Sequence, residues 1–380
     1  MALHFSIEEL AERRARTCAL LADQGLDGLL MFRQESMYYL TGYDTFGYVF
    51  FQCLYLGQDG RMVLLTRAPD RRQAEETSCI EDLRIWVDHP DARPAEDLRA
   101  ILAEVGCAGR TLGVEYEAYG LTARNGKRLE AALEGFCRLE DASELVTRLR
   151  VVKSPAEVAY VREAAALADA ALDEAQALAA PGAFEGDILA AMQGAIFKGG
   201  GDYPGNEFII GSGKDALLCR YFSGRRTLEA RDQLTLEWAG AYRHYHAAMM
   251  RTIPIGEVPA KQREMHGVAR EALLAVEDNL KPGQTYGEAF DAHARVMDAA
   301  GYQAHRMNAC GYSLGTTFSP NWMDWPMLYH ANPVEIQPGM VIFCHMIIFD
   351  DTQKLAMTLG RTSLISDRGA EPLSTASLEI

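Results

Sequence analysis

Residues 234–252 constrain the fold most strongly, because they read as two consecutive strands. Within 234–238, apolar side chains at every second position alternate with Thr and Glu, a period that is typical of a strand with one buried face. Gly240 is expected to end this strand, and a second strand then carries His246. We therefore expect a hairpin that brings Glu237 and His246 together.

The pair of Glu237 and His246 has two interpretations. A carboxylate beside an imidazole on a dry sheet face can act as an acid/base or nucleophile pair, because burial raises the pKa of the acid and a neighbouring cation lowers it. Alternatively, the two side chains form a buried hydrogen bond with a purely structural role. Both interpretations stay open at this point.

The charge of the chain favours a small substrate over a large anionic partner. The 380 residues include 53 acidic and 37 basic side chains, a formal net charge of −16. Nucleic acids and anionic membrane surfaces require a basic face on the protein, so neither is an expected partner. A small or zwitterionic substrate fits this charge better.

The cysteines and the amino terminus indicate a cytoplasmic protein. Eight cysteines are scattered without a C-x-x-C pair, so neither a zinc knuckle nor a dithiol redox motif is expected. Reduced thiols are typical of the cytosol. The first ten residues carry acids where a signal peptide carries bases, and no run of 18 apolar residues is present that could span a membrane.

Residues 1–150 are expected to form an α/β domain, because short apolar segments alternate with helical ones. An aromatic stretch at 38–48 contains Phe46 and Tyr48 and is interpreted as a loop, since glycines interrupt it. Its rings either fill the core or form the wall of a pocket.

A second domain is expected over residues 151–380. Ser154 and Pro155 are typical of the first residues of a helix, which places the joint between the domains just before them. Two helical segments followed by strands occur twice in this domain, which indicates a pseudo-duplicated architecture. His345 lies within an apolar strand, where a lone histidine is usually structural.

Several short motifs resemble the methionine aminopeptidase, prolidase and creatinase superfamily. They are Arg150–Glu157, Met249–Thr252, Lys281–Gly283, Cys310–Gly315 and Ile336–Val341. The resemblance runs over nearly the whole chain. It implies an α/β (α+β) fold, with a creatinase-type α/β amino-terminal domain followed by a pita-bread carboxyl-terminal catalytic domain.

The resemblance also identifies the positions at which metallopeptidases of this superfamily bind metal. Those enzymes hold two ions with two Asp, one His and two Glu side chains. The corresponding positions in this chain are Glu237, Ala248, Tyr312, His345 and Gly360. One carboxylate and one imidazole cannot replace five ligands of two hard cations, so no metal or other cofactor is expected.

Creatinase-like members of the superfamily hydrolyse a small C–N bond with side chains alone, but creatine is a poor substrate candidate here. The catalytic histidine of creatinase falls near Arg220, and its two active-site glutamates fall at Met250 and His345. In the amino-terminal loop Phe46 is kept, whereas Tyr48 replaces an arginine that binds the substrate.

The ectoine hydrolase family provides a better match. Its version of the site is similar to Leu236–Gly240, Tyr242–Thr252 and Trp322–Trp325 of this chain. Membership would imply opening of the cyclic amidine ring of ectoine, and of 5-hydroxyectoine, to an N-acetyl-diaminobutyrate. It would also imply a homodimer, and a deacetylase that acts on the product is an expected partner.

Ectoine is a zwitterion, and the candidate residues follow from its chemistry. Glu237 is expected to attack the amidinium carbon or to activate a water molecule, His246 or His345 to protonate the departing nitrogen, and Tyr312 to stabilise the tetrahedral intermediate. A planar amidinium suits aromatic faces, and its carboxylate suits a guanidinium. The residues expected to bind the substrate are Phe46, Tyr48, Trp238, Trp322 and Trp325, with Arg220 and Arg306 at the carboxylate.

Two other classes of function remain open on the sequence. One is a pita-bread protein that binds a partner without catalysis, with Glu237 and His345 as remnants of an ancestral site. The other is a metal-dependent peptidase or lyase with an unusual set of ligands.

Overall fold

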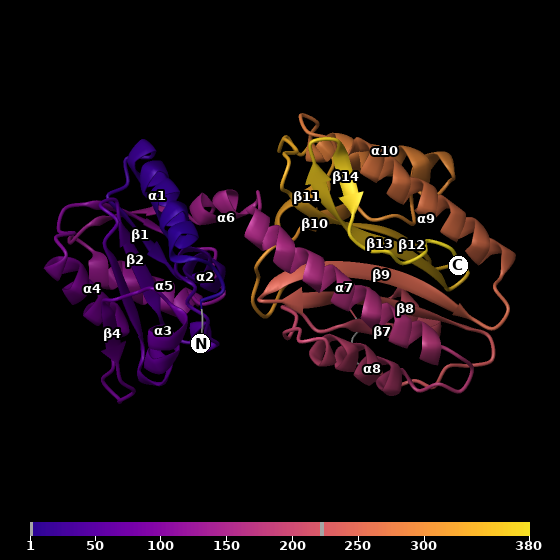
Figure 1. Cartoon of the computed structure of the whole chain (residues 1–380), viewed down its shortest axis with the longest axis horizontal. Coiled ribbons are helices and arrows are strands. Elements are labelled where there is room, and N and C mark those ends of the chain that lie inside the picture. The colour runs from indigo at the N-terminus through magenta and orange to yellow at the C-terminus, as the bar shows by residue number, and fades with distance from the viewer. Residues whose placement is uncertain (1–2, 221–223) are drawn as a thin grey trace. The chain divides into compact units, whose positions relative to one another are not determined.

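The computed structural model describes residues 3–220 and 224–380. The chain divides into two units, Met1–Arg150 and Val151–Ile380 (Figure 1). No helix within the described ranges is both long and apolar enough to cross a membrane.

The amino-terminal unit is built around a sheet with helices on both faces. The strand order is β4-β3-β2-β1-β5-β6, in which β1 pairs in parallel with β5 and antiparallel with β2. The strands are β1 (Gly28–Met31), β2 (Cys53–Gly57), β3 (Met62–Arg67), β4 (Leu83–Trp86), β5 (Thr111–Val114) and β6 (Arg138–Asp141). The helices are α1 (Ile7–Asp23), α2 (Gln34–Thr41), α3 (Arg71–Thr77), α4 (Pro94–Glu104), α5 (Ala123–Leu133) and α6 (Leu145–Arg150).

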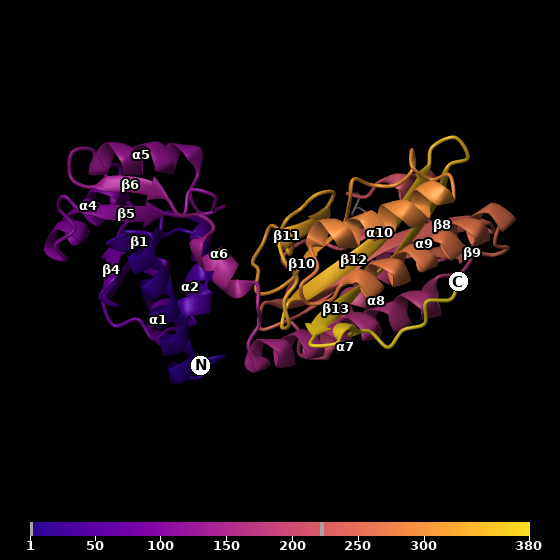
Figure 2. The ribbon, with the colours of Figure 1, turned by 90° about the horizontal axis from the view of Figure 1, so that it is seen from above.

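Two hydrophobic cores fill the two sides of this sheet. One lies under α4 and α5, and the other lies under α1, α2 and α6 (Figure 2). The aromatic stretch at 38–48, expected as a loop, begins within helix α2, which ends at Thr41 with Gly42 as its C-cap, and Tyr38 and Tyr39 are fully buried. Beyond α2, Tyr48 is buried whereas Phe46 is 72 % exposed.

The carboxyl-terminal unit contains a long sheet and two pairs of helices. The strand order is β11-β10-β12-β13-β9-β8-β7, and β14 pairs with β13. The helices are α7 (Pro155–Leu178), α8 (Glu185–Lys198), α9 (Ala260–Asn279) and α10 (Tyr286–Ala299). The strands are β7 (Ile209–Ser212), β8 (Asp232–Tyr242), β9 (Tyr245–Ile255), β10 (Ala309–Ser313), β11 (Asp324–Tyr329), β12 (Val341–Asp350), β13 (Leu355–Ser366) and β14 (Gly369–Pro372).

Helix α7 packs on β8 and β9, and α9 packs on β12 and β13 (Figure 1). Ser154 and Glu157 form a capping box at the start of α7, with Pro155 as its first residue. The helix approaches β8 so closely that a Cβ atom on Gly240 would overlap the carbonyl oxygen of Ala164. Gly240 therefore permits close helix–strand contact near the end of β8.

The expectation that Gly240 ends the strand is wrong. Strand β8 continues to Tyr242, and the turn to β9 consists of Arg243 and His244, both with positive φ (50° and 64°). Positive φ at both central residues is the requirement of a type I′ hairpin turn, which Asn-Gly usually meets. The hydrogen bond that the His244 N–H donates to Asp202 Oδ2 (3.1 Å) supports this turn.

Candidate active site

Glu237 lies on the face of the sheet opposite to the helices. Directly opposed residues of antiparallel strands share a face. Glu237 pairs with Met250, Met250 pairs with Gly360, and Gly360 pairs with His345. These pairings place the side-chain positions of Glu237, Gly360 and His345 together.

The other two positions that hold metal in the related peptidases lie on the same face. Ala248 is two residues from Met250 along β9, and Tyr312 pairs with Phe343, which is two residues from His345. Residues two apart on a strand share a face. All five positions inferred from the resemblance therefore lie on one face of the sheet.

The side chains at these positions do not fit a pair of metal ions. Ala248 and Gly360 offer no donor atom, which leaves Glu237 as the carboxylate. Within 3–220 and 224–380, no group of three or more His, Cys, Asp or Glu side chains could hold a metal ion. Hard divalent cations require several oxygen or imidazole ligands. The five positions thus share one face of the sheet, but the side chains at these positions do not supply the ligands that two metal ions require.

A cavity of about 190 Å³ opens beside Glu237. Methionines from three positions form much of its apolar wall, namely Met307, Met323 and Met327. The polar side chains that line it are Asn206, Cys219, Arg220, Tyr312, Asn321, Trp322 and His345. The cavity therefore combines one acid, one guanidinium and aromatic rings in a small volume.

A chain of hydrogen bonds ends on Glu237. The indole Nε1–H of Trp322 donates to Tyr312 Oη (2.9 Å), and the Tyr312 hydroxyl donates to Glu237 Oε1 (3.2 Å). Burial raises the pKa of Glu237 to about 7, although the bond from Tyr312 and the charge of Arg220 lower it. Near neutral pH Glu237 is thus divided between acid and carboxylate, which suits a general base or a nucleophile.

His345 lines the same cavity but is not a cation at neutral pH. Burial, together with the positive charge of Arg220, lowers its pKa to about 4. Its Nδ1 is buried and makes no hydrogen bond to any residue of the ranges 3–220 and 224–380. His345 can therefore accept a proton, or donate from a neutral ring, but it does not enter the reaction as an imidazolium.

The expected contact between Glu237 and His246 is wrong. His246 pairs with Ala241, four residues along β8 from Glu237, because the turn lies beyond Gly240. Both nitrogens of its buried ring are occupied, since Gly205 N–H donates to Nε2 (2.9 Å) and Nδ1 lies 3.1 Å from Thr317 Oγ1. Burial lowers its pKa to about 4, so the ring is neutral.

Of the residues expected to bind substrate, Trp322 and Arg220 line the cavity and three others do not. Trp238 is fully buried on the helix side of β8, where its Nε1–H donates to the Ala168 carbonyl (2.9 Å). Arg306 forms an ion pair with Asp298 (2.6 Å). Trp325 packs against the hydrophobic core around α9 and α10. The expectation that Trp238 binds substrate in this cavity is therefore wrong, whereas a role of Arg306 or Trp325 stays a prediction.

Phe46 and Tyr48 belong to the amino-terminal unit. Their rings contact edge to face, with centroids 5.8 Å apart. A role of either residue in substrate binding stays a prediction.

Asn206 and Asn321 are cavity residues that the sequence analysis did not select. Both lie in loops, where no periodic pattern reveals which side chain faces inward. Asn321 Oδ1 accepts a hydrogen bond from the Met323 N–H (3.0 Å), which fixes the orientation of the side-chain amide at the edge of the cavity. The position of Asn321 beside Trp322 was the signal that could have identified it.

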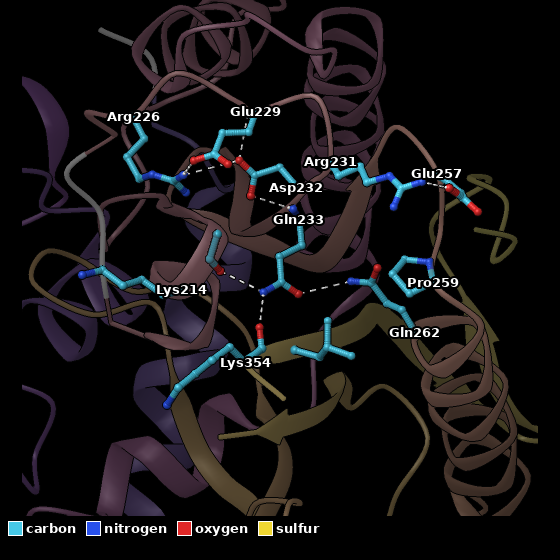
Figure 3. A pocket seen from close by; sticks show the side chains of 12 residues that line it. Lys214, Arg226, Glu229, Arg231, Asp232, Gln233, Glu257, Pro259, Gln262 and Lys354 are labelled. Atoms are coloured by element: carbon cyan, nitrogen blue, oxygen red, sulfur yellow. Dashed lines mark hydrogen bonds and ion pairs between the residues drawn. The ribbon is translucent and has the colours of Figure 1, made fainter. Parts of the chain in front are cut away.

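A larger groove, of about 590 Å³, lies at the start of β8 (Figure 3). Its charged side chains largely compensate one another, since Arg226 pairs with Glu229 and Arg231 pairs with Glu257. Gln233 bridges the groove by donating to the Lys354 carbonyl (2.8 Å) (Figure 3). These contacts, together with the ion pair between Arg226 and the buried side chain of Asp232 (3.6 Å), stabilise the packing at the start of β8.

Comparisons with known proteins agree with this architecture. The model of metallopeptidase family M24 matches residues 159–367, more than half of the chain, and that of the creatinase/prolidase N-terminal domain matches residues 13–152. Over 99 % of both chains, a solved prolidase from Thermococcus sibiricus superposes with a TM-score of 0.89 at 18 % identity. A solved Xaa-Pro dipeptidase from Bacillus anthracis superposes with a TM-score of 0.84 at 21 % identity, over 98 % of this chain and 99 % of that one. These comparisons confirm the predicted fold.

Two curated relatives match along nearly their whole lengths. An uncharacterised hydrolase/peptidase of Sinorhizobium fredii is 28 % identical over 100 % of this chain and 98 % of its own. An ectoine hydrolase of Halomonas elongata is 27 % identical over 98 % of this chain and 97 % of its own. The chain therefore belongs to metallopeptidase family M24, a family of hydrolases and peptidases, and carries a creatinase/prolidase N-terminal domain in front of the M24 domain.

Proposed function

We propose that this protein hydrolyses a C–N bond of a small cyclic amidinium, with ectoine as the substrate, by side-chain chemistry alone. The observation that carries the proposal is Glu237, a buried carboxyl group with a pKa of about 7 that lines a small cavity, on a sheet face where the positions that the resemblance assigns to metal binding keep only one carboxylate and one imidazole. The relative named ectoine hydrolase supports the choice of substrate.

The cavity suits a molecule of this size and charge. Its volume of about 190 Å³ lies below the ~300–1,000 Å³ of pockets that bind drug-sized ligands, and ectoine has about ten non-hydrogen atoms. The amidinium would lie against Glu237 and the rings of Tyr312 and Trp322, while Arg220 would bind the carboxylate. Because a bound cation favours the ionised form of its neighbour, the substrate would itself convert Glu237 to the carboxylate.

The reaction requires one attack on carbon and one proton transfer to nitrogen. Glu237 takes a proton from water, the water oxygen bonds to the amidinium carbon, and the electrons of the C=N bond move to nitrogen. The proton held by Glu237 passes to the departing ring nitrogen, and the C–N bond breaks as the hydroxyl oxygen forms the C=O bond of the amide. The hydroxyl proton passes to the Glu237 carboxylate and from there to the released amine, which restores the base. Direct attack by the Glu237 carboxylate, followed by hydrolysis of the acyl-type intermediate, gives the same products.

In either route the hydroxyl of Tyr312 steadies the charge on the reacting oxygens, and neutral His345 is the further proton carrier within the cavity. His246 has no direct part, since its nitrogens bind other groups. The homodimer and a deacetylase that processes the product remain predictions.

The test is incubation of protein dialysed against a chelator with ectoine, 5-hydroxyectoine, creatine and Xaa-Pro dipeptides, followed by identification of the products. We expect N-acetyl-diaminobutyrate from ectoine, and loss of at least 100-fold in rate for Glu237→Gln, as is typical for removal of a general base. Cleavage of the dipeptides after addition of manganese or zinc would instead support a metal-dependent peptidase. No turnover of any substrate would support the non-catalytic alternative.

A further inference from the structure

His246 joins three segments of the chain that are far apart in sequence. Gly205 N–H donates to its Nε2 (2.9 Å), so Nε2 carries no proton and the neutral ring carries its proton on Nδ1. Thr317 Oγ1 lies 3.1 Å from Nδ1, and the Gly315 carbonyl lies 3.4 Å from it. The ring thus connects β9, the loop that holds Gly205 and the loop that follows β10.

The hydrogen bonds beyond Nδ1 all run in one direction, toward the cavity. Since His246 Nδ1–H donates to Thr317 Oγ1, the Thr317 hydroxyl is free to donate to the Trp322 carbonyl (3.4 Å). The indole of Trp322 then donates to Tyr312, and Tyr312 donates to Glu237. The Nδ1–H has a second acceptor in the Gly315 carbonyl (3.4 Å), whereas the later donors Thr317, Trp322 and Tyr312 each donate to one acceptor in this series.

We propose that His246 is a positioning residue, which acts through Thr317 and the Trp322 loop to hold the Tyr312 hydroxyl on Glu237. Loosening of this loop weakens the bond that favours the carboxylate form of Glu237, so the acid form persists to higher pH. This inference depends on the proposed function in one respect, namely that Glu237 has a catalytic role.

Other groups also act on the two ends of this series. Tyr312, Arg220, His345 and Cys219 face Glu237 from the surrounding segments. His246 is influenced by the charges of His244 and Asp324. A substitution at Thr317 leaves the chemical identity of all these side chains unchanged. It therefore tests the hydrogen-bond series more directly than a substitution at His246 does.

The experiment is a titration of the Glu237 carboxyl carbon by NMR in protein labelled with [δ-13C]glutamate, with the signal assigned by its absence in Glu237→Gln. Thr317→Val removes the hydroxyl at nearly constant volume, and His246→Gln removes the imidazole. We expect both to move the Glu237 midpoint upward by about one pH unit, because a hydrogen bond to a charged group is worth roughly that much. Thr317→Ser should restore the wild-type midpoint.

Thr66→Val is the matched control for loss of a buried hydroxyl. Thr66 is fully buried in the amino-terminal unit, where its hydroxyl donates to Gln52 Oε1 (3.3 Å) and lies 3.3 Å from the Tyr43 hydroxyl. We expect this variant to leave the Glu237 midpoint unchanged. A shift of equal size in Thr66→Val and Thr317→Val would mean that the titration reports general loosening, and it would overturn the proposal.

The titration needs no substrate, so the two proposals fail separately. A folded Thr317→Val protein with an unchanged or lowered midpoint overturns the role of His246, even if wild-type protein hydrolyses ectoine. A raised midpoint in a protein that leaves ectoine intact supports the role of His246 and overturns the proposed substrate. Where ectoine is hydrolysed, the acid limb of kcat/KM should move with the NMR midpoint.

Discussion

Replacing Glu237 by Gln should stabilise the carboxyl-terminal unit at alkaline pH, although it removes the group on which the proposed reaction depends. The pKa of Glu237 is about 7 in the folded protein against a reference of 4.5, chiefly because the carboxyl group is buried. Between these values the unfolded chain releases its proton while the folded chain retains it. The free energy of unfolding therefore falls as pH rises through this window.

The size of the effect follows from the width of that window. At about 1.4 kcal/mol per pH unit, the ionised carboxyl group costs the folded state almost nothing below pH 4 and about 3 kcal/mol above pH 8. A Gln side chain does not titrate, so it contributes no pH dependence in this range. The free energy of unfolding of Glu237→Gln minus that of wild type should therefore increase by about 2.5 kcal/mol from pH 5 to pH 8. A pH-independent effect of the amide does not alter this increase.

The assay is urea unfolding of both proteins at pH 5 and pH 8, followed by tryptophan fluorescence. Trp238, Trp322 and Trp325 lie in the carboxyl-terminal unit and Trp86 in the other, so the signal reports mainly on the relevant unit. Glu163→Gln, on the exposed surface of α7, is the matched control and should show no such gain. Equal differences between variant and wild type at the two pH values would refute a raised pKa for Glu237.

Four further predictions address the cavity. Tyr312→Phe should move the acid limb of the pH–rate profile upward by about one unit, with activity recovering above pH 9; an unshifted limb in kcat/KM measurements would contradict the bond to Glu237. Arg220→Gln should raise KM for ectoine at least ~10-fold, the loss typical of a charge-assisted hydrogen bond, and steady-state kinetics with an unchanged KM would remove Arg220 from the site. Trp238→Phe should lower the free energy of unfolding by about 1 kcal/mol and leave KM as in wild type; a raised KM would return Trp238 to substrate binding. Dialysis against a chelator should leave the rate of ectoine hydrolysis unchanged, whereas loss of activity that metal salts restore would contradict the reading of the donor set.

The position of Glu237 could be predicted from the sequence because strand alternation is a local property. Its place on β8, opposite the helix-covered side that holds Trp238, follows from a period of two. The superfamily motifs then supplied the long-range order, and the register of β8, β9, β10, β12 and β13 brings the five inferred positions to one face.

The partners of Glu237 could not be predicted in the same way. The turn at Arg243 and His244 has no glycine, so the sequence suggested a hairpin that closes earlier, and a shifted turn changes which residues oppose one another. Arg306 and Trp325 were chosen for their chemistry, but an ion pair with Asp298 and packing against a core engage them elsewhere. Asn206 faces the cavity from a loop, where sequence carries no periodic signal.

Gly360 bears on whether this chain could regain a peptidase centre by point substitution. A Cβ atom there would lie 2.8 Å from the carbonyl oxygen of Cys344 and 3.0 Å from the ring of Phe343, and the same residue's carbonyl accepts a hydrogen bond from Arg251 (2.6 Å). Neighbouring atoms thus leave too little room for a Cβ atom at position 360. Restoring acidic side chains at the ancestral positions would not suffice, because Phe343 and the backbone beside it would have to retreat first. Packing around Gly360 therefore opposes the return of a metal ligand at this position.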